Sequence, residues 1–444
     1  MNYKELAENL VKKCQKNGAD AAEIYIESER NLNVEIRNGE VETVQESTSN
    51  GCGFRVFVGG KMAFSHCNDF SDEALENTIK SAVGFARITT ADENNVLPDE
   101  KGITDVGALY DPKIAGVSLD QKIRMAVEAE KEAMKDARIT KSAGAAYGEG
   151  ENEITLANSN GLLKSCKISS CYFGVSVVAE KVDQKSSGGE YCSRRFFDDL
   201  KPIEEVAAKA AKDAYEMLDP RMVKTQKVPV VFDPDVARAL LGGILAAVNG
   251  ERVLQGASFL GKKSEQQIGS ELLTLIDDGT RPKGLGTTPF DGEGVPTQKR
   301  TIIQNGILKG FMYNTIVAKR AGVKSTGNAS RRGFTSLPGI GAHNFFMEAG
   351  KTPPENIINA TKTGLYLKGV TGYGINPVNG NFSGGASGFW IENGKLSFPV
   401  KGLTIAGTAD EMLNGIDMVG TDLDLNRAFT APTFRIKLLQ IGGK

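Results

Sequence analysis

The residue types best suited to metal binding or nucleophilic catalysis are few and scattered along this chain. His66 and His343 are the only histidines, and no local pattern around them indicates a shared site, so we expect structural or surface roles for both. None of the six cysteines forms a Cys-x-x-Cys pair or has a histidine at zinc-finger spacing. The cysteines are therefore expected to be free thiols, mostly buried. They are Cys14, Cys52, Cys67, Cys166, Cys171 and Cys192.

The glycine-rich segments also lack the partners that catalysis or nucleotide binding would need. Gly384 to Gly388 superficially resembles a nucleophile turn, but it is not Gly-x-Ser-x-Gly and has no indicated base. Gly51-x-Gly53 precedes a strand pattern, whereas a dinucleotide loop precedes a helix. We interpret these glycines as tight turns, or as places where an extended peptide approaches the backbone closely.

Two distant blocks carry a family resemblance. Gly388 to Leu423 contains two strand patterns around Asn393-Gly394, a type I′ turn signal, and follows the run Asn376 to Gly380. Together with Ser49 to Ala82, this block resembles the TldD/PmbA family. Its members are often named modulators of DNA gyrase, and the family is associated with cytosolic peptide cleavage. The resemblance thus implies a metalloprotease hypothesis that other residues can test.

The resemblance also implies where a metal motif would lie. Metal-bearing, TldD-type members carry His-Glu-x-x-x-His on a helix, which matches Gly243 to Gly256 and places the motif at Ala247, Val248 and Arg252. Methyl and isopropyl groups cannot bind zinc, arginine has no lone pair to donate, and Val248 cannot act as a base. The late cysteine of TldD-type members is also missing, since none follows Cys192. We therefore expect no metal, no cofactor and no catalytic residue, as in the PmbA or TldE type.

Hydrophobic periodicity and turn signals predict an α+β protein, with a mixed α/β amino-terminal part followed by a β-rich carboxy-terminal domain. We expect an amino-terminal α/β domain and connector over residues 1–115, a central α+β segment packed with it over 116–222, and the family's β-rich domain over 223–444. Asn2 and Ser71 are predicted helix caps, and Asp233-Pro234 is a predicted helix start. The polar segment Val182 to Tyr191 is expected to be a mobile loop.

Charge and hydropathy exclude several classes of function. Lys plus Arg number 53 and Asp plus Glu number 55, so the net charge of −2 gives no sign of nucleic-acid binding. The amino terminus has no uninterrupted apolar segment, so neither a signal peptide nor a membrane helix is predicted. These features and the scattered cysteines suit a cytoplasmic protein.

The resemblance leads to a functional hypothesis with two alternatives. We expect a metal-less subunit that shapes a chamber for unfolded peptide and supports proteolysis by a zinc-bearing TldD-type partner, and that forms a homodimer when alone. The alternatives are a free-standing homodimeric peptide-binding or regulatory protein, and an independent peptidase. A sheet edge can pair with the backbone of an extended peptide, and we expect the loop Thr326 to Gly333 and the run Asn379 to Gly388 to form the walls of that site. The candidate substrate-binding residues are Thr326, Asn328, Arg331, Arg332, Asn381, Ser383, Gly384 and Gly385.

Overall fold

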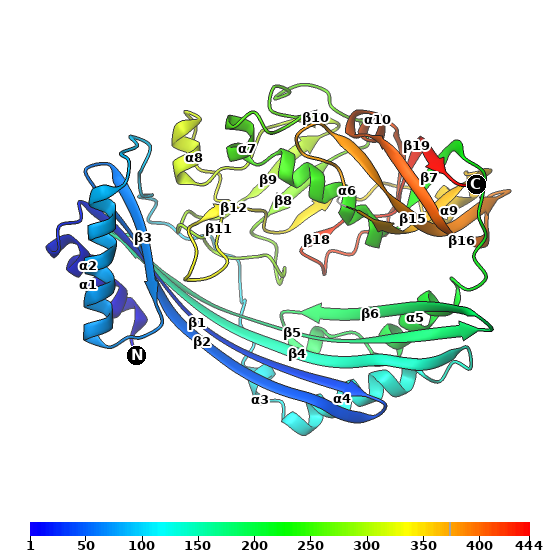
Figure 1. Ribbon diagram of the computed structural model, residues 1–444, viewed down its shortest axis with the longest axis horizontal. Coiled ribbons are helices and arrows are strands. Elements are labelled where there is room, and N and C mark those ends of the chain that lie inside the picture. Colours follow the sequence, from blue (N-terminus) through cyan, green and yellow to red (C-terminus); the bar gives the residue numbers. More distant parts are fainter. Residues whose placement is uncertain (373) are drawn as a thin grey trace.

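The computed structural model describes residues 1–372 and 374–444, and its first half is organised around one long curved sheet (Figure 1). This amino-terminal sheet has six antiparallel strands in the order β3-β2-β1-β4-β5-β6. The strands are β1 (Ala21–Arg37), β2 (Glu40–Val58), β3 (Lys61–Cys67), β4 (Ile139–Asn158), β5 (Leu163–Lys181) and β6 (Gln184–Arg194). Residues 1–115 and 116–222 therefore each supply three strands to a single sheet.

The helices of the first half cover one face of this sheet. In β1, Ile24 and Ile26 pack with the helices at one end, and Val34 and Ile36 pack with those at the other. Alternate residues of a strand share a face, so all four side chains point to the same helical layer. The main helices of this layer are α1 (Tyr3–Lys16), α2 (Asp72–Ile88), α4 (Leu119–Ala133) and α5 (Ile203–Tyr215), with the short α3 (Pro112–Gly116) near α4.

Side-chain caps begin α1 and α2 where the sequence predicts them. The Asn2 side chain accepts a hydrogen bond from the Glu5 N–H, and the Ser71 hydroxyl accepts one from the Ala74 N–H. Each cap satisfies a backbone donor that has no partner inside the helix. Both cap predictions are confirmed.

The predicted mobile loop at Val182 to Tyr191 is wrong, because these residues form most of the hairpin strand β6. Val182 adopts a positive φ of 53° at the turn, and β6 then pairs with β5 along its whole length. The small residues that suggested a loop have a packing role. A Cβ at Gly188 would lie 2.3 Å from the Ala210 carbonyl oxygen of α5, so only glycine lets the strand approach that helix.

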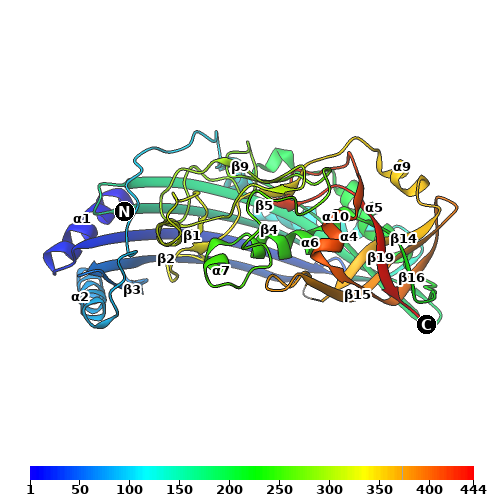
Figure 2. The same cartoon turned by 90° about the horizontal axis from the view of Figure 1, so that it is seen from above.

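The carboxy-terminal part, from residue 226 on, lies along the concave face of the amino-terminal sheet (Figures 1 and 2). One six-stranded sheet, in the order β16-β15-β14-β7-β19-β17, closes on itself because β16 also pairs with β19. Its strands are β7 (Gln226–Phe232), β14 (Thr363–Thr371), β15 (Asn381–Glu392), β16 (Lys395–Thr408), β17 (Ile416–Val419) and β19 (Phe434–Gly442).

A second sheet of this part has the order β10-β9-β8-β13-β18. Its strands are β8 (Leu275–Asp278), β9 (Lys299–Gln304), β10 (Ile307–Leu308), β13 (Phe345–Met347) and β18 (Phe429–Thr430), and a separate pair joins β11 (Ala329–Ser330) to β12 (Gly339–Ile340). The helices are α6 (Pro234–Ala247), α7 (Gly250–Leu254), α8 (Thr315–Arg320), α9 (Pro354–Asn359) and α10 (Ala409–Asn414). Helices and strands in both parts confirm the predicted α+β class.

The two parts are joined near one end of the molecule by a buried charge cluster. Arg55 of β2 bonds Glu23 of β1 at 2.6 Å and Glu293 of the carboxy-terminal part at 2.8 Å, and Arg331 pairs with Glu23 from the other side. All four side chains are at most 1% exposed. Two cations thus neutralise two anions away from water, which a buried charge requires.

Among the described residues, no helix has both the length and the apolar character needed to cross a membrane.

Candidate functional site

The segment matched to the metal motif lies at a break between two helices. Helix α6 ends at Ala247, and α7 begins after Asn249, whose side-chain oxygen accepts hydrogen bonds from the N–H groups of Glu251 and Arg252. The chain turns here because the Gly250 N–H bonds the Met312 carbonyl at 2.9 Å instead of continuing the helix.

The residues at the three motif positions do not fit a metal ion. Ala247 and Val248 are fully buried in the hydrophobic core, whereas Arg252 is exposed on the separate helix α7. They therefore share no common cavity and supply no lone pair. Within the described ranges, no three His, Cys, Asp or Glu side chains are grouped closely enough to hold a metal. No step of metal-assisted hydrolysis can be derived from these positions.

Thr326 and Asn328, two candidate substrate-binding residues, are buried and bonded within the chain. The Thr326 hydroxyl hydrogen-bonds the Asn328 side-chain oxygen at 2.7 Å. The Asn328 amide donates to the Asp277 carboxylate at 2.7 Å and to the Gly341 carbonyl at 3.0 Å. His343 belongs to the same network, because its backbone N–H donates to the Asp277 carboxylate at 2.8 Å. These contacts hold the loop in place.

Arg331 and Arg332, the next candidates, have different surroundings. The Arg331 side chain is only 1% exposed, donates to the Gly292 and Ser336 carbonyls, and pairs with Glu23. Its guanidinium therefore joins the two parts of the molecule and is turned away from solvent. Arg332 is exposed and remains accessible to an acidic group.

From Gly385 onward, the glycine-rich run lies between two partner strands of a sheet. Strand β15 pairs with β14 from Gly385 onward and with β16 from Asn381 onward. Its ladder groups are therefore used within the sheet, and they cannot pair with a peptide along most of the strand. Asn381 and Ser383 still present exposed side chains. The run and the loop Thr326 to Gly333 belong to different sheets.

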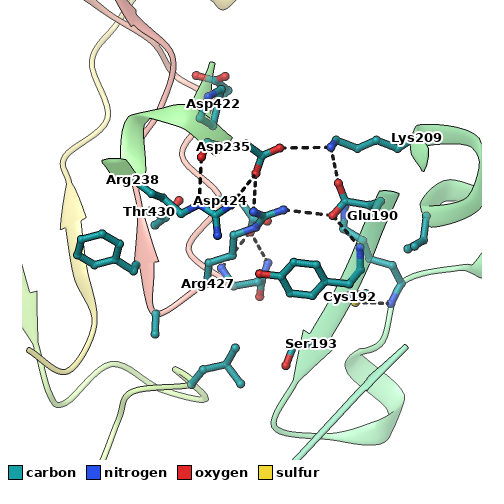
Figure 3. A pocket seen from close by; sticks show the side chains of 18 of the residues that line it. Glu190, Cys192, Ser193, Lys209, Asp235, Arg238, Asp422, Asp424, Arg427 and Thr430 are labelled. Atoms are coloured by element: carbon teal, nitrogen blue, oxygen red, sulfur yellow. Dashed lines mark hydrogen bonds and ion pairs between the residues drawn. The ribbon is translucent and has the colours of Figure 1, made fainter. Parts of the chain in front are cut away.

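A different site stands out in the structure, a cavity of about 630 Å³ between β6 and the carboxy-terminal part (Figure 3). One wall is Glu190 to Arg194 of β6, with side chains of α5 beside it. The opposite walls are the start of α6 and the segment Asp422 to Thr430, which includes β18. We call this space the β6 cavity. Its volume lies within the range of small-molecule and cofactor sites.

Charged side chains from both parts of the molecule meet at this cavity, as Figure 3 shows. Arg427 bonds Asp235 of α6 at 2.5 Å and Glu190 of β6 at 3.1 Å. Lys209 of α5 pairs with Glu190 and lies 3.4 Å from Asp235. Arg238 is 3.8 Å from Asp235 on the same helix. Two carboxylates thus bridge cations from α5, α6 and the segment before β18.

The local electrostatics favour the charged forms of these groups. Burial alone would raise the pKa of Asp235, but the nearby Arg427 and Lys209 outweigh it and lower that pKa. Burial would lower the pKa of Lys209. The hydrogen bond to Glu190 and the negative charges of Asp213 and Asp235 outweigh burial and raise that pKa. The neighbouring Asp233 differs, because burial dominates and raises its pKa. Asp235 and Lys209 are therefore both charged at neutral pH.

Two sheet edges border the β6 cavity. Strand β6 is the last strand of the amino-terminal sheet, and β18 is the last strand of the five-stranded sheet. Edge strands carry backbone N–H and C=O groups that their own sheet does not use. The cavity therefore combines ionic side chains with unused backbone groups.

Sequence reasoning missed the residues of this site. Glu190, Lys209, Asp235 and Arg427 are dispersed along the chain, and no motif connects them. Their only signal is Ser186 to Gly189, which was interpreted as a loop. Strand pairing between β5 and β6 would have been needed to find them.

Comparisons with known proteins cover almost the whole chain. The PmbA/TldA metallopeptidase family models match as domain 1 over residues 22–86, the central domain over 112–218 and the C-terminal domain over 225–443. The metalloprotease PmbA of Escherichia coli O157:H7 is 31% identical over 436 residues, which cover 96% of this chain and 93% of that protein. The chain belongs to the TldD/PmbA family.

Solved structures agree with this assignment. A Bacteroides thetaiotaomicron VPI-5482 protein that bears a DNA gyrase modulator description has a TM-score of 0.91 at 29% identity, covering 99% of each chain. TldE from Thermococcus kodakarensis has a TM-score of 0.90 at 27% identity, covering 98% of this chain and 99% of that one. The resemblance stated from the sequence is confirmed at the level of the family.

Proposed function

We propose that this protein is a metal-less, TldE-type subunit of a cytoplasmic TldD/TldE-type protease. In this role the chain shapes a chamber for unfolded peptide, and a zinc-bearing TldD-type partner supplies the hydrolytic centre. Arg332, Asn381 and Ser383 are the accessible side chains among the residues that the sequence indicated for peptide contact. Thr326, Asn328 and Arg331 act by fixing the loop that carries them, and Gly384 and Gly385 are part of strand β15.

One observation carries the proposal. At the positions that the resemblance assigns to metal chemistry, Ala247 and Val248 are completely buried and apolar, and Arg252 is a cation on another helix. A protein of a metallopeptidase family that keeps its fold but not its metal-binding chemistry can contribute to hydrolysis by binding substrate or by positioning a partner.

The test mixes purified chain with a purified TldD-type relative that carries the His-Glu-x-x-x-His motif. Cleavage of an unfolded peptide is followed for each protein alone and for the mixture. The proposal predicts no cleavage by this chain alone, formation of a mixed complex in size-exclusion chromatography, and faster cleavage by the mixture than by the relative. If no mixed complex forms and the relative alone is equally fast, the chain is a free-standing binding protein.

A further inference from the structure

Residues 423–427 form part of the wall of the β6 cavity between β17 and β18, outside any helix or strand. Within the ranges 1–372 and 374–444, none of their backbone groups bonds a residue outside the segment. The one bond of a backbone group runs from the Asn426 N–H to the Asp424 carboxylate at 2.9 Å. A segment with so few backbone bonds can open locally while the sheets around it stay folded. We call residues 423–427 the flap.

A single side chain ties the flap to its surroundings. Arg427 bonds Asp235 of α6 at 2.5 Å and Glu190 of β6 at 3.1 Å (Figure 3). No other flap residue, among those that the structure describes, has an ion pair or a hydrogen bond outside the flap. The Arg427 side chain is 21% exposed and that of Asp235 is 33% exposed, so water and salt compete for these pairs.

The residues that hold the flap lie between two cavities. A second cavity, of about 350 Å³, shares Glu190, Asp235 and Arg427 with the β6 cavity. Its other walls include Asp213 of α5 and Lys368 of β14. Side chains that line two cavities at once form the partition between them. Release of Arg427 therefore removes part of that partition.

A third cavity, of about 560 Å³, lies on the concave face of the amino-terminal sheet. Its lining residues Glu35, Ala146, Gly174 and Tyr191 are paired directly across β1, β4, β5 and β6, so they share one face. Ile36, the neighbour of Glu35, packs with the helices, so the shared face is the opposite, concave one. Tyr191 borders all three cavities, which therefore meet at β6.

The other contacts between the two parts are fixed more firmly than the flap. Strand β6 pairs with β5 along its whole length, and Gly188 packs against α5. Near the other end of the molecule, the four side chains of the Arg55 cluster are at most 1% exposed. Salt screens buried pairs of this kind much less than exposed ones. The flap is therefore the part of the cavity wall that moves most easily.

We propose that Arg427 latches the flap closed, and that opening of the flap joins the β6 cavity to the concave face of the amino-terminal sheet. In the closed form, Arg427 bridges Glu190 and Asp235. In the open form its guanidinium is hydrated, and Lys209 stays with the two carboxylates because it pairs with both. The two anions thus keep a cation, which lowers the cost of opening. The latch belongs to the chain itself and does not depend on the subunit role.

Limited proteolysis of the chain alone measures the opening. An endoproteinase that cuts before aspartate cleaves between Leu423 and Asp424 when the flap is displaced, and mass spectrometry identifies the cut. When opening is fast compared with cleavage, the rate reports the population of the open form. Cleavage before Asp278, a buried residue of β8, reports global unfolding in the same sample. A free peptide with the sequence of the flap corrects for effects of salt on the protease.

Two perturbations act on the latch. Raising the NaCl concentration from about 0.02 to about 0.5 M screens the ion pairs of Arg427 in the wild-type chain. Arg427→Met removes these pairs and keeps a long side chain. Lys309→Met is the matched control, because it removes a partly exposed pair with Glu265 that lies away from the cavity.

We expect salt to speed cleavage before Asp424 about two- to fivefold in the wild-type chain, with no cleavage before Asp278. Arg427→Met should speed cleavage before Asp424 about three- to tenfold at low salt and abolish the salt effect, whereas Lys309→Met should behave as the wild-type chain. A wild-type rate that does not respond to salt would overturn the proposal even if Arg427→Met does not fold. A salt effect of unchanged size in a folded Arg427→Met chain would also overturn it, and so would parallel acceleration of the cuts before Asp424 and Asp278.

Discussion

Removing Arg55 should destabilise the junction between the two parts of the molecule far more than removing an exposed arginine that joins the same parts. Arg55→Met keeps a long apolar side chain but deletes the bonds to Glu23 and Glu293. Glu293 would then be a fully buried carboxylate that has lost its cation, and Glu23 would keep only Arg331. Breaking a buried pair by removing one partner costs about 3–5 kcal/mol.

The matched control is Arg320→Met. Arg320 of α8 bonds Asp92 of the connector at 2.6 Å, so it also links the carboxy-terminal part to the first half. Its side chain is 40% exposed and that of Asp92 is 29% exposed. Solvent-exposed pairs contribute about 0–1 kcal/mol, because water and salt screen them. The two variants therefore differ mainly in the burial of the pair that they remove.

Urea unfolding followed by tryptophan fluorescence measures the difference. Trp390 is the only tryptophan in the chain, and it is a buried residue of β15 in the carboxy-terminal part. Arg55→Met should lower the free energy of unfolding by about 3 kcal/mol or more, and Arg320→Met by less than about 1 kcal/mol. Equal effects of the two substitutions would refute the reasoning that burial sets the strength of this junction.

Three further predictions concern pH, metal content and assembly. Burial, with a contribution from Glu293, raises the pKa of Asp291 to about 7. The folded protein therefore keeps this carboxyl protonated at pH values where the unfolded chain has lost the proton. The stability that this proton adds is fully present below the ordinary pKa of aspartate and is lost as the pH rises through 7. Urea stability should therefore fall between about pH 5 and about pH 8, and fall less in Asp291→Asn. Elemental analysis after dialysis should find no stoichiometric zinc, and about one zinc per chain would contradict this. Multi-angle light scattering of the chain alone should give a homodimer mass, whereas a monomer mass at all concentrations would contradict it.

Local signals in the sequence predicted much of the fold because they act over a few residues. Asn38, Asn305 and Asn393 each precede glycine, and all three adopt positive φ values of 48° to 55° in the turns that join paired strands. Turn and cap chemistry depends on neighbouring residues alone, so it can be interpreted without a tertiary structure.

The errors arose where tertiary packing decides the structure. The segment around Gly188 is polar and rich in small residues, a composition typical of loops, yet close contact with α5 requires such residues in a strand. The run from Asn379 to Gly388 was expected to form a wall for peptide, and strand pairing places its part from Gly385 onward between β14 and β16. Burial of Arg331 depends on Glu23, which lies far away in the sequence. No local pattern predicts these long-range contacts.

The most direct test of the central claim is a titration of a TldD-type relative with this chain. The cleavage rate of an unfolded peptide is measured at a fixed concentration of the relative while the concentration of this chain increases. Our account predicts that the rate rises and then saturates at a fixed ratio of the two proteins, while this chain alone gives no cleavage. A rate that does not change with added chain, or cleavage by this chain alone, would contradict the account.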